Sequence, residues 1–384
     1  MKILISTTYF HPYSSGLSVY ALRLAEGLAE LGHEVVVLTS QYEKDLPLRE
    51  VYGKFLIVRV PVTMHLSKGV IMAGLPNAAR EWVDWADIVN LHLPQFEALV
   101  PSTIAASLGK PVLAMYHCDL VMSGGLINKL AGVITTALGK MVLDKAALIV
   151  QNSLDYAENS AVLSKYLEKV VASPTPITVK TVSKERAKQF RSEHGFDEKD
   201  RIIGLAGRVA TEKGYEYLAL ALPKILQKFP DARVVHAGAW KSVVGEQAYQ
   251  EQIEEFIRPF GEKWQSLGFL PDEVFETFFS VCDVLVFSSL NATESYGIVQ
   301  LEAMTQGTPV VASNLPGVRH PVKVTGLGKI VPIRDADAIA GAVIAILEKG
   351  EKARFVPAEF LADYQQEAVA RRYEAWMEAI LNNE

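Results

Sequence analysis

The sequence predicts an α/β protein built from two doubly wound, Rossmann-like domains that face each other across a cleft. Short apolar runs alternate with helical patterns along the 384 residues, which is typical of strand–helix–strand units in a parallel sheet. The length suits two domains. Segment 171–182 contains two prolines, and a charged segment follows it. We interpret this segment as the linker.

The first half begins with a strand, a helix and a second strand. Ile3–Ser6 is a short apolar run, Leu17–Leu31 places apolar residues at helical spacing and stops at Gly32, and Glu34–Leu38 is β-branched. These patterns predict one βαβ unit. Further strands are expected at residues 55–60, 88–91, 112–116 and 148–150. The first domain should therefore span residues 1–176.

The second half repeats this alternation and predicts a second domain over residues 177–357, followed by a final helical segment, 358–384. The expected elements, in order, are a strand from Arg201, a helix within Gly214–Phe229, a strand from Arg233, helix Asp272–Ser280, strand Val284–Ser288, helix Ile298–Gln306, strand Pro309–Ala312, helix Asp337–Lys349 and a helix over about Ala358–Leu381.

Composition argues against several classes of protein. The chain has 38 basic and 44 acidic residues, whereas nucleic-acid binders normally carry a basic domain or stripe. Its two cysteines, Cys118 and Cys282, cannot build a disulfide framework, which favours a reducing compartment. No run approaches the roughly 18 apolar residues of a membrane span. We therefore expect a cytoplasmic protein with no nucleic-acid partner.

Two charged residues follow the first strand of the second half. Arg208 and Lys213 lie five positions apart in GRVATEKG, before an expected helix. An arginine fork and a lysine point charge can together hold a diphosphate. Taken alone, the loop would be better explained as carrying two solvated surface charges.

A second loop carries two carboxylates around a helix start. In NATESYGIVQLEAMTQGTPVVAS, Glu294 precedes the expected helix and Glu302 lies within it. Gly297 and Ile298 offer backbone N–H groups at the helix start, where anions bind. The carboxylates can accept hydrogen bonds from sugar hydroxyls. The loop after the first strand, by contrast, has only Gly16 and lacks the three-glycine dinucleotide fingerprint, which argues against a nicotinamide-dependent dehydrogenase.

These segments resemble the retaining glycosyltransferases of family 4. ESYGIVQLEAMTQGTPVVAS resembles that family's paired-glutamate motif, GRVATEKG its phosphate loop, and LGFLPDEVFETFFSVCDVLVFSS the stretch before the glutamates. The first forty residues resemble its N-terminal unit, although Ser15–Gly16 stands where paired glycines are frequent. The resemblance implies a GT-B fold, in which the last helix crosses back to the first domain.

The resemblance also implies roles at the donor diphosphate. Arg208 and Lys213 would neutralise it, including the charge that develops on the leaving group. Backbone groups at Gly297 and Ile298 would contact its phosphates, and Gly16 would do so from the first domain.

The sugar and nucleoside would be held by other residues. The resemblance implies that Glu302 binds the ribose, that Glu294 holds the donor sugar, and that Phe269 and Leu270 lie beside the nucleobase. His117 would stand beside the donor sugar and orient it. We interpret other histidines, namely His33, His92 and His236, as structural, because they lie in a turn, at a strand end and inside a strand.

The expected reaction is a retaining, metal-independent transfer of a hexose from a nucleotide diphosphate sugar, such as UDP-glucose, to a saccharide or lipid-linked acceptor in polysaccharide or glycolipid assembly. No cofactor and no metal is expected, because no His/Cys cluster has metal-ligand spacing. Asp335 and Asp337 precede a helix and are interpreted as capping or first-turn residues. The alternatives are a nucleotide-sugar epimerase or phosphorylase on the same fold and a non-catalytic sugar-nucleotide-binding protein.

Segment 124–147 has two interpretations. It is apolar, with Lys129, Lys140 and Lys145 opposed only by Asp144. The first and slightly favoured interpretation is a pair of core-facing helices. The second is an interfacial helix that contacts the membrane peripherally, which would suit a lipid-linked acceptor.

Overall fold

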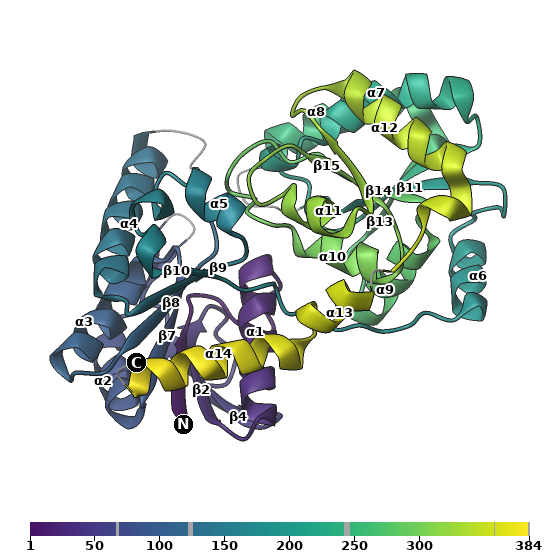
Figure 1. Ribbon diagram of the computed structural model, residues 1–384. Helices are drawn as coiled ribbons and strands as arrows, with labels where there is room; N and C mark the ends of the chain where they lie inside the picture. The colour runs from purple at the N-terminus through teal and green to yellow at the C-terminus, as the bar shows by residue number, and fades with distance from the viewer. Residues whose placement is uncertain (67–68, 122–125, 242–245, 357, 383–384) are drawn as a thin grey trace. The chain divides into compact units, whose positions relative to one another are not determined.

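The computed structural model describes residues 1–66, 69–121, 126–241, 246–356 and 358–382. The chain divides into two compact units (Figure 1): unit 1 comprises Met1–Thr178 and Ala362–Glu384, and unit 2 comprises Val179–Leu361. Each unit has its own sheet, in which parallel strands predominate, with helices packed against it. The predicted class of two Rossmann-like α/β domains is confirmed. No helix of the described segments has both the length and the apolar character needed to cross a bilayer.

Unit 1 has an eight-stranded sheet in the order β10-β9-β8-β7-β1-β2-β4-β3, and a separate hairpin, β5–β6. All of the sheet's pairs are parallel except β3 with β4. The strands are β1 (Lys2–Ser6), β2 (Glu34–Gln41), β3 (Arg49–Tyr52), β4 (Phe55–Pro61), β5 (Met64–Leu66), β6 (Gly69–Ile71), β7 (Ile88–Leu93), β8 (Val112–Tyr116), β9 (Leu148–Gln151) and β10 (Val170–Ala172). The helices are α1 (Gly16–Glu30), α2 (Leu75–Trp85), α3 (Leu99–Ser107), α4 (Leu126–Lys145), α5 (Leu154–Asn159) and α14 (Gln366–Leu381).

Unit 2 has a six-stranded sheet, β13-β12-β11-β14-β15-β16, in which every pair is parallel. The strands are β11 (Arg201–Ala206), β12 (Ala232–Ala237), β13 (Trp264–Gly268), β14 (Val284–Phe287), β15 (Val310–Ser313) and β16 (Gly328–Val331). The helices are α6 (Lys184–Glu193), α7 (Tyr215–Lys228), α8 (Gln247–Ile257), α9 (Asp272–Val281), α10 (Ile298–Thr305), α11 (His320–Thr325) and α12 (Ala336–Lys349). The chain passes from unit 2 back to unit 1 within α13 (Ala358–Tyr364).

Each sheet has a switch point beside its first strand. From β11 the chain first builds outward through β12 and β13, and then returns to add β14 on the opposite side. In unit 1, β1 likewise has β2 on one side and β7 on the other. Ligands of open parallel sheets bind beyond the carboxyl ends of the strands at such points. The loops after β1, β7, β11 and β14 are therefore where a site is expected.

Side-chain caps mark the starts of several helices, among them α1 and α12. Ser15 Oγ accepts a hydrogen bond from the Ser18 amide at 3.2 Å, and Ser18 Oγ accepts one from the Ser15 amide at 2.8 Å. This reciprocal pair fixes the start of α1 at Gly16. Asp335 Oδ1 accepts from the Ala338 amide at 2.8 Å, which confirms its predicted capping role at α12.

Two helical expectations are wrong. The segment Ala358–Leu381 forms two helices instead of one, because Gln365 adopts an extended conformation with ψ 144° and forms a parallel bridge with Ile177. The favoured helix pair in 124–147 is instead the single helix α4. Residues 124–125 of that segment lie outside the described residues.

The last helix returns to unit 1, where α14 (yellow) lies beside α1 (purple) in Figure 1. Their hydroxyl groups meet at Tyr20 and Tyr373, 2.9 Å apart, with both side chains buried. The helices approach closely at Gly27, since a Cβ atom there would lie 2.8 Å from Ala370 Cβ. The predicted crossing of the chain back to the first domain is confirmed.

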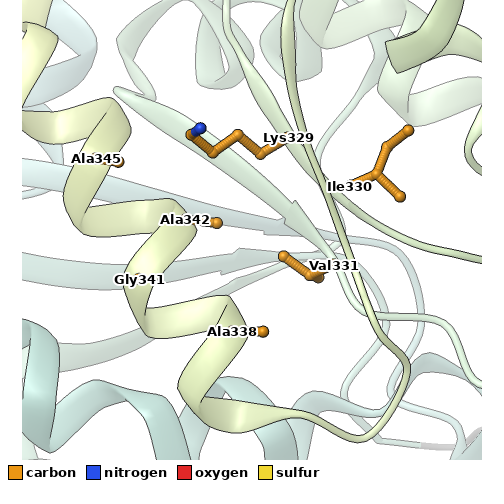
Figure 2. A pocket seen from close by; sticks show the side chains of 7 residues that line it. All are labelled: Lys329, Ile330, Val331, Ala338, Gly341, Ala342 and Ala345. Carbon is orange, nitrogen blue, oxygen red and sulfur yellow. The ribbon is translucent and has the colours of Figure 1, made fainter.

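Alanine substitutions at two helical glycines should therefore have opposite effects on stability. Each gains about 0.5–1 kcal/mol of helix stability. At Gly27 the added methyl group overlaps Ala370, and overpacking costs roughly 1–3 kcal/mol, so Gly27→Ala should lower the melting temperature. Gly341→Ala on α12 is the control, because its methyl group enters open space beside the hollow in Figure 2. A higher melting temperature for Gly27→Ala, measured by circular dichroism, would contradict the close approach.

Candidate active site

In unit 2 the loops that follow β11 and β14 are fastened to each other. These strands are direct neighbours in the sheet, so both loops emerge at the same edge. The Ser288 hydroxyl donates toward two carbonyl oxygens, that of Lys213 at 2.9 Å and that of Gly214 at 3.1 Å. The Leu290 amide donates to the Glu212 carbonyl at 2.8 Å. The two loops therefore form one rim at the switch point.

This rim holds an ion pair between Lys213 and Glu294. The two side chains are only 15% and 18% exposed, and the Lys213 ammonium stands 5.2 Å from the centroid of the Phe287 ring. Such partial burial strengthens the attraction beyond that of a surface pair. The structure thus brings together two residues that the sequence placed in separate motifs.

Arg208 has a different partner. Its Nη2 donates to Glu212 Oε1 at 2.6 Å, and its side chain is 44% exposed. Both predicted cations are therefore paired with a carboxylate. An anionic ligand would have to exchange with one or both carboxylates, and the exposed Arg208 pair is the easier one to open.

Two glycines allow neighbouring groups to approach the backbone of the rim closely. Gly214 has φ 63°, and a Cβ there would lie 2.6 Å from the Ser288 carbonyl oxygen. Gly297 has φ 84°, and its Cβ would lie 2.5 Å from the Phe287 ring. Left-handed φ values favour glycine at both positions. Gly297 is the N-cap of α10, so the helix starts at the rim. The first amides of the helix, from Ile298 onward, therefore lie at the rim.

The remaining predicted residues of unit 2 lie around the same sheet edge. Glu302 is partly buried on α10, one turn beyond Ile298. Phe269 and Leu270 follow β13, two strands away from β11. Phe269 is 70% exposed, which leaves its ring available to a ligand.

His236 supports the loop after β11 from below. Its Nε2 donates to the Gly207 carbonyl oxygen at 2.7 Å, and the Tyr215 hydroxyl donates to the same oxygen at 3.3 Å. Burial lowers the pKa of His236 to about 4, so it is a neutral donor. From the other side, the Thr211 amide donates to Glu246 at 2.9 Å. The predicted structural role of His236 is thus specific: it holds the loop that carries Arg208.

In unit 1, His117 follows β8 and contacts a second histidine. His117 Nε2 and His92 Nδ1 are 2.9 Å apart. The exposures are 8% for His117 and 0% for His92. Burial lowers the pKa of His92 to about 3, while burial and the neighbouring His92 lower the pKa of His117 well below its usual value. The sequence did not reveal this contact. Gly16, the other predicted residue of unit 1, is the first residue of α1.

A buried carboxyl group at the switch point of unit 1 was not among the residues predicted from the sequence. Glu97 is 7% exposed and accepts hydrogen bonds from the Val70 amide at 3.2 Å and from Thr8 Oγ1 at 3.4 Å. Burial raises the pKa of Glu97 despite these bonds. A narrow crevice here is also lined by Gln95 and Thr39. The available signal was the position of Gln95 and Glu97 just after a strand.

The more open hollow in Figure 2 lies away from these residues. It has a volume of about 380 Å³ and is lined by β16 and α12. Lys329 is its one charged lining residue, and the lining from α12 consists of alanines and a glycine. This lining provides few groups that could bind a polar ligand or take part in catalysis. Across the described ranges, no group of three or more His, Cys, Asp or Glu side chains is placed to hold a metal ion.

Two family models match the chain, one in each half. The model "Glycosyl transferases group 1" matches residues 186–356, and the model "Glycosyltransferase Family 4" matches residues 14–177. The first match contains the Lys213–Glu294 rim, and the second contains Gly16 and His117.

Curated relatives agree with these matches. A phosphatidyl-myo-inositol mannosyltransferase of Mycolicibacterium smegmatis is 28% identical, over 91% of this chain and 85% of that protein. A 2-deoxystreptamine N-acetyl-D-glucosaminyltransferase of Streptomyces fradiae is 27% identical, over 99% and 97%.

Solved structures share the fold over the full length. Sucrose-phosphate synthase from Thermosynechococcus elongatus has a TM-score of 0.79 at 19% identity, with 100% of both chains covered. The Anabaena protein HepE in complex with UDP has a TM-score of 0.74 at 18% identity, covering 99% of this chain and 100% of that one. At these sequence identities, the two structures support a shared fold only.

The two family matches and the relatives favour a transferase over the epimerase, phosphorylase and non-catalytic alternatives. With a glycosyltransferase model matched on each of its two Rossmann-like units, this chain is a glycosyltransferase of the GT-B fold.

Proposed function

We propose that this glycosyltransferase transfers a hexose, with retention of configuration and without a metal ion, from a UDP-sugar such as UDP-glucose. The acceptor is a saccharide or a lipid-linked saccharide, and the product serves polysaccharide or glycolipid assembly at the cytoplasmic face of a membrane. The observation that carries the proposal is the largely buried Lys213–Glu294 pair on the switch-point rim of unit 2.

In this proposal the donor diphosphate exchanges with the carboxylates at the rim. Arg208 and Lys213 pair with phosphate oxygens, and the helix-start amides at Gly297 and Ile298 add two further donors. Gly16 supplies a backbone contact from the start of α1. Fixed cations and amides stabilise the charge on a leaving diphosphate, so the reaction requires no metal ion.

The same exchange frees Glu294 for the sugar. Once phosphate replaces it as the partner of Lys213, its carboxylate can accept hydrogen bonds from sugar hydroxyls. Glu302 on α10 accepts from the ribose hydroxyls, and the exposed Phe269 with Leu270 covers the base. The preference for UDP is supported by HepE, whose structure is described with UDP.

The chemical step breaks the bond between the anomeric carbon and the diphosphate oxygen through an oxocarbenium-like state. The acceptor oxygen attacks the same face and forms the new glycosidic bond, and its proton passes to the leaving diphosphate oxygen. His117 and Glu294, which we propose as the catalytic residues, hold the sugar in position. The relatives transfer mannosyl and N-acetylglucosaminyl groups, which supports a hexose-type donor.

A membrane contact of α4 forms part of the proposal. Leu130, Val133, Ile134 and Met141 are 62%, 67%, 49% and 46% exposed, and their helical spacing places them on one face. The helix sequence carries three lysines and one aspartate. An exposed apolar face with excess positive charge suits an anionic lipid surface. The phosphatidyl-myo-inositol acceptor of one relative supports a lipid-linked substrate.

Nucleotides should protect the protein selectively against thermal unfolding. We expect UDP to raise the melting temperature more than GDP or ADP, and a chelator to leave this shift unchanged. A ligand at 100 times its Kd contributes about 2.7 kcal/mol. Protection that disappears on chelation would contradict metal independence, and protection by none of the three would contradict the donor site.

Substitutions of the ion pair should act on UDP binding in opposite directions. Lys213→Met removes a charge-assisted bond to phosphate and should weaken UDP binding about 10-fold or more. Glu294→Gln removes the competing carboxylate, so UDP should bind as tightly or more tightly, while kcat should fall on the order of 100-fold.

Calorimetry and steady-state kinetics measure these effects. Lys224→Met is the matched control, because Lys224 is an exposed lysine of unit 2 that pairs with Asp337 at 3.1 Å. Equal loss of UDP affinity in both rim variants would refute the proposed exchange of partners.

Vesicle binding tests the α4 face. In flotation with vesicles that contain anionic lipid, Val133→Ser/Ile134→Ser should bind several-fold less than the unsubstituted chain, because about 25 cal/mol per Å² of apolar contact is lost. Val51→Ser controls for the loss of an exposed apolar residue elsewhere in unit 1, since Val51 on β3 is 78% exposed. Equal flotation of all three proteins would contradict the proposed membrane contact of α4.

A further inference from the structure

The strongest chemical feature that the proposed function leaves unexplained is the second histidine of unit 1. His92 belongs to β7 and His117 follows β8, the neighbouring strand. In the parallel register His92 lies opposite Met115, and His117 is two residues beyond Met115. Because side chains two positions apart share a face of the sheet, both imidazoles lie on the same face and meet.

The pair is enclosed by aromatic packing. The planes of the imidazole rings are inclined by 27° and their centroids are 5.1 Å apart, so the rings meet edge to edge through the two nitrogens. Tyr20 of α1 presents its ring edgewise to both, at 6.0 Å from His92 and 5.2 Å from His117. The Leu93 carbonyl accepts a hydrogen bond from the His117 amide at 2.8 Å. The backbone of His117 is thus held by β7, and Tyr20 packs against both rings.

The four ring nitrogens are in different environments. His92 Nδ1 and His117 Nε2 face each other at 2.9 Å. His92 Nε2 is enclosed and has no hydrogen-bond partner among the residues that the structure describes. His117 Nδ1 makes no hydrogen bond within those residues either, but it is not one of the enclosed atoms. It is therefore the nitrogen that a ligand can reach.

These environments decide where the protons lie. An enclosed N–H without an acceptor is rarer in folded proteins than an under-used acceptor, so the proton of His92 belongs on Nδ1. That N–H donates to His117 Nε2, which must then be the acceptor. The single proton of a neutral His117 consequently lies on Nδ1, at the accessible edge of the ring.

We propose that His92 is a positioning residue that holds His117 as a neutral imidazole with its Nδ1–H directed to ligand. His117 can then donate a hydrogen bond to a sugar hydroxyl oxygen, and it is not available as a base at that nitrogen. The assignment of this hydrogen bond to the donor sugar rests on the proposed function. The assignment of the protons does not, since it follows from the contacts within unit 1.

The burial of both rings agrees with this assignment. The pKa of each histidine is lowered by burial, and for His117 also by its neighbour. The titratable side chain packed against both rings is Tyr20, whose own pKa is raised by burial and which therefore stays uncharged. Both imidazoles remain neutral through the physiological range.

The protonation states can be measured directly on the full chain labelled with ¹⁵N-histidine. Long-range ¹H–¹⁵N spectra should show His117 protonated at Nδ1 and unprotonated at Nε2, without charge between about pH 5.5 and 8. The chain contains its own references: His236 must carry its proton on Nε2 to reach the Gly207 carbonyl, and His194 on Nδ1 to reach that of Phe190 at 2.9 Å. A proton on His117 Nε2, or a charged His117 in this range, would overturn the proposal.

Two variants separate positioning from simple packing. His92→Leu fills the space without a donor and should give His117 a mixture of tautomers, with kcat on UDP-glucose lower on the order of 10-fold and UDP affinity unchanged. His92→Asn can place its Nδ2 amide near the position of Nδ1 and should restore the single tautomer and most of kcat. Equal kcat and an unchanged His117 spectrum in folded His92→Leu would show that His92 only packs. If the spectra agree and no transfer occurs with any sugar nucleotide, the proposed function fails while the proton assignment stands.

Discussion

The parallel pairing of β11 with β14 is the constraint on which the candidate active site depends. Lys213 and Glu294 are 81 residues apart in the chain, and only the return of the chain to the central strand brings their loops to one edge. Side chains pack closely against β11 at Gly204, where a Cβ would lie 2.6 Å from the Cys282 sulfur. Above the strands, the hydrogen bonds of Ser288 and Leu290 join the two loops that carry the charges.

The candidate site residues of the two units lie in different electrostatic environments. Unit 2 keeps opposite charges at partial exposure, where a Lys213 that lost Glu294 would need another anion to replace it. At the candidate site of unit 1, burial disfavours the charged forms: it lowers the pKa values of both histidines and raises that of the Glu97 carboxyl. The first arrangement suits a ligand that carries charge, and the second suits hydroxyl groups.

The C-terminal helix is part of the support of the histidine pair. Tyr373 on α14 meets the hydroxyl of Tyr20, and Tyr20 packs edgewise on His92 and His117. A contact from the end of the chain thus reaches the site in unit 1 through one aromatic side chain. The separation of α13 from α14 at Gln365 serves this docking, because the extended Gln365 pairs with Ile177.

Features that arise from neighbouring residues could be predicted from local patterns in the sequence. Apolar runs and helical spacing predicted the two α/β units, the position of Asp335 predicted the cap of α12, and the spacing of Glu294 and Glu302 placed one before a helix and the other within it. Hydrogen bonds and side-chain faces over three or four residues are visible in a sequence because the local backbone fixes them.

Contacts between distant residues became visible in the folded chain alone. It paired Lys213 with Glu294 and left Arg208 to Glu212, and it placed His92 against His117, 25 residues away. It also replaced the expected single C-terminal helix with two. The Lys213–Glu294 and His92–His117 contacts depend on strand order and register, which bring together residues that no local pattern links.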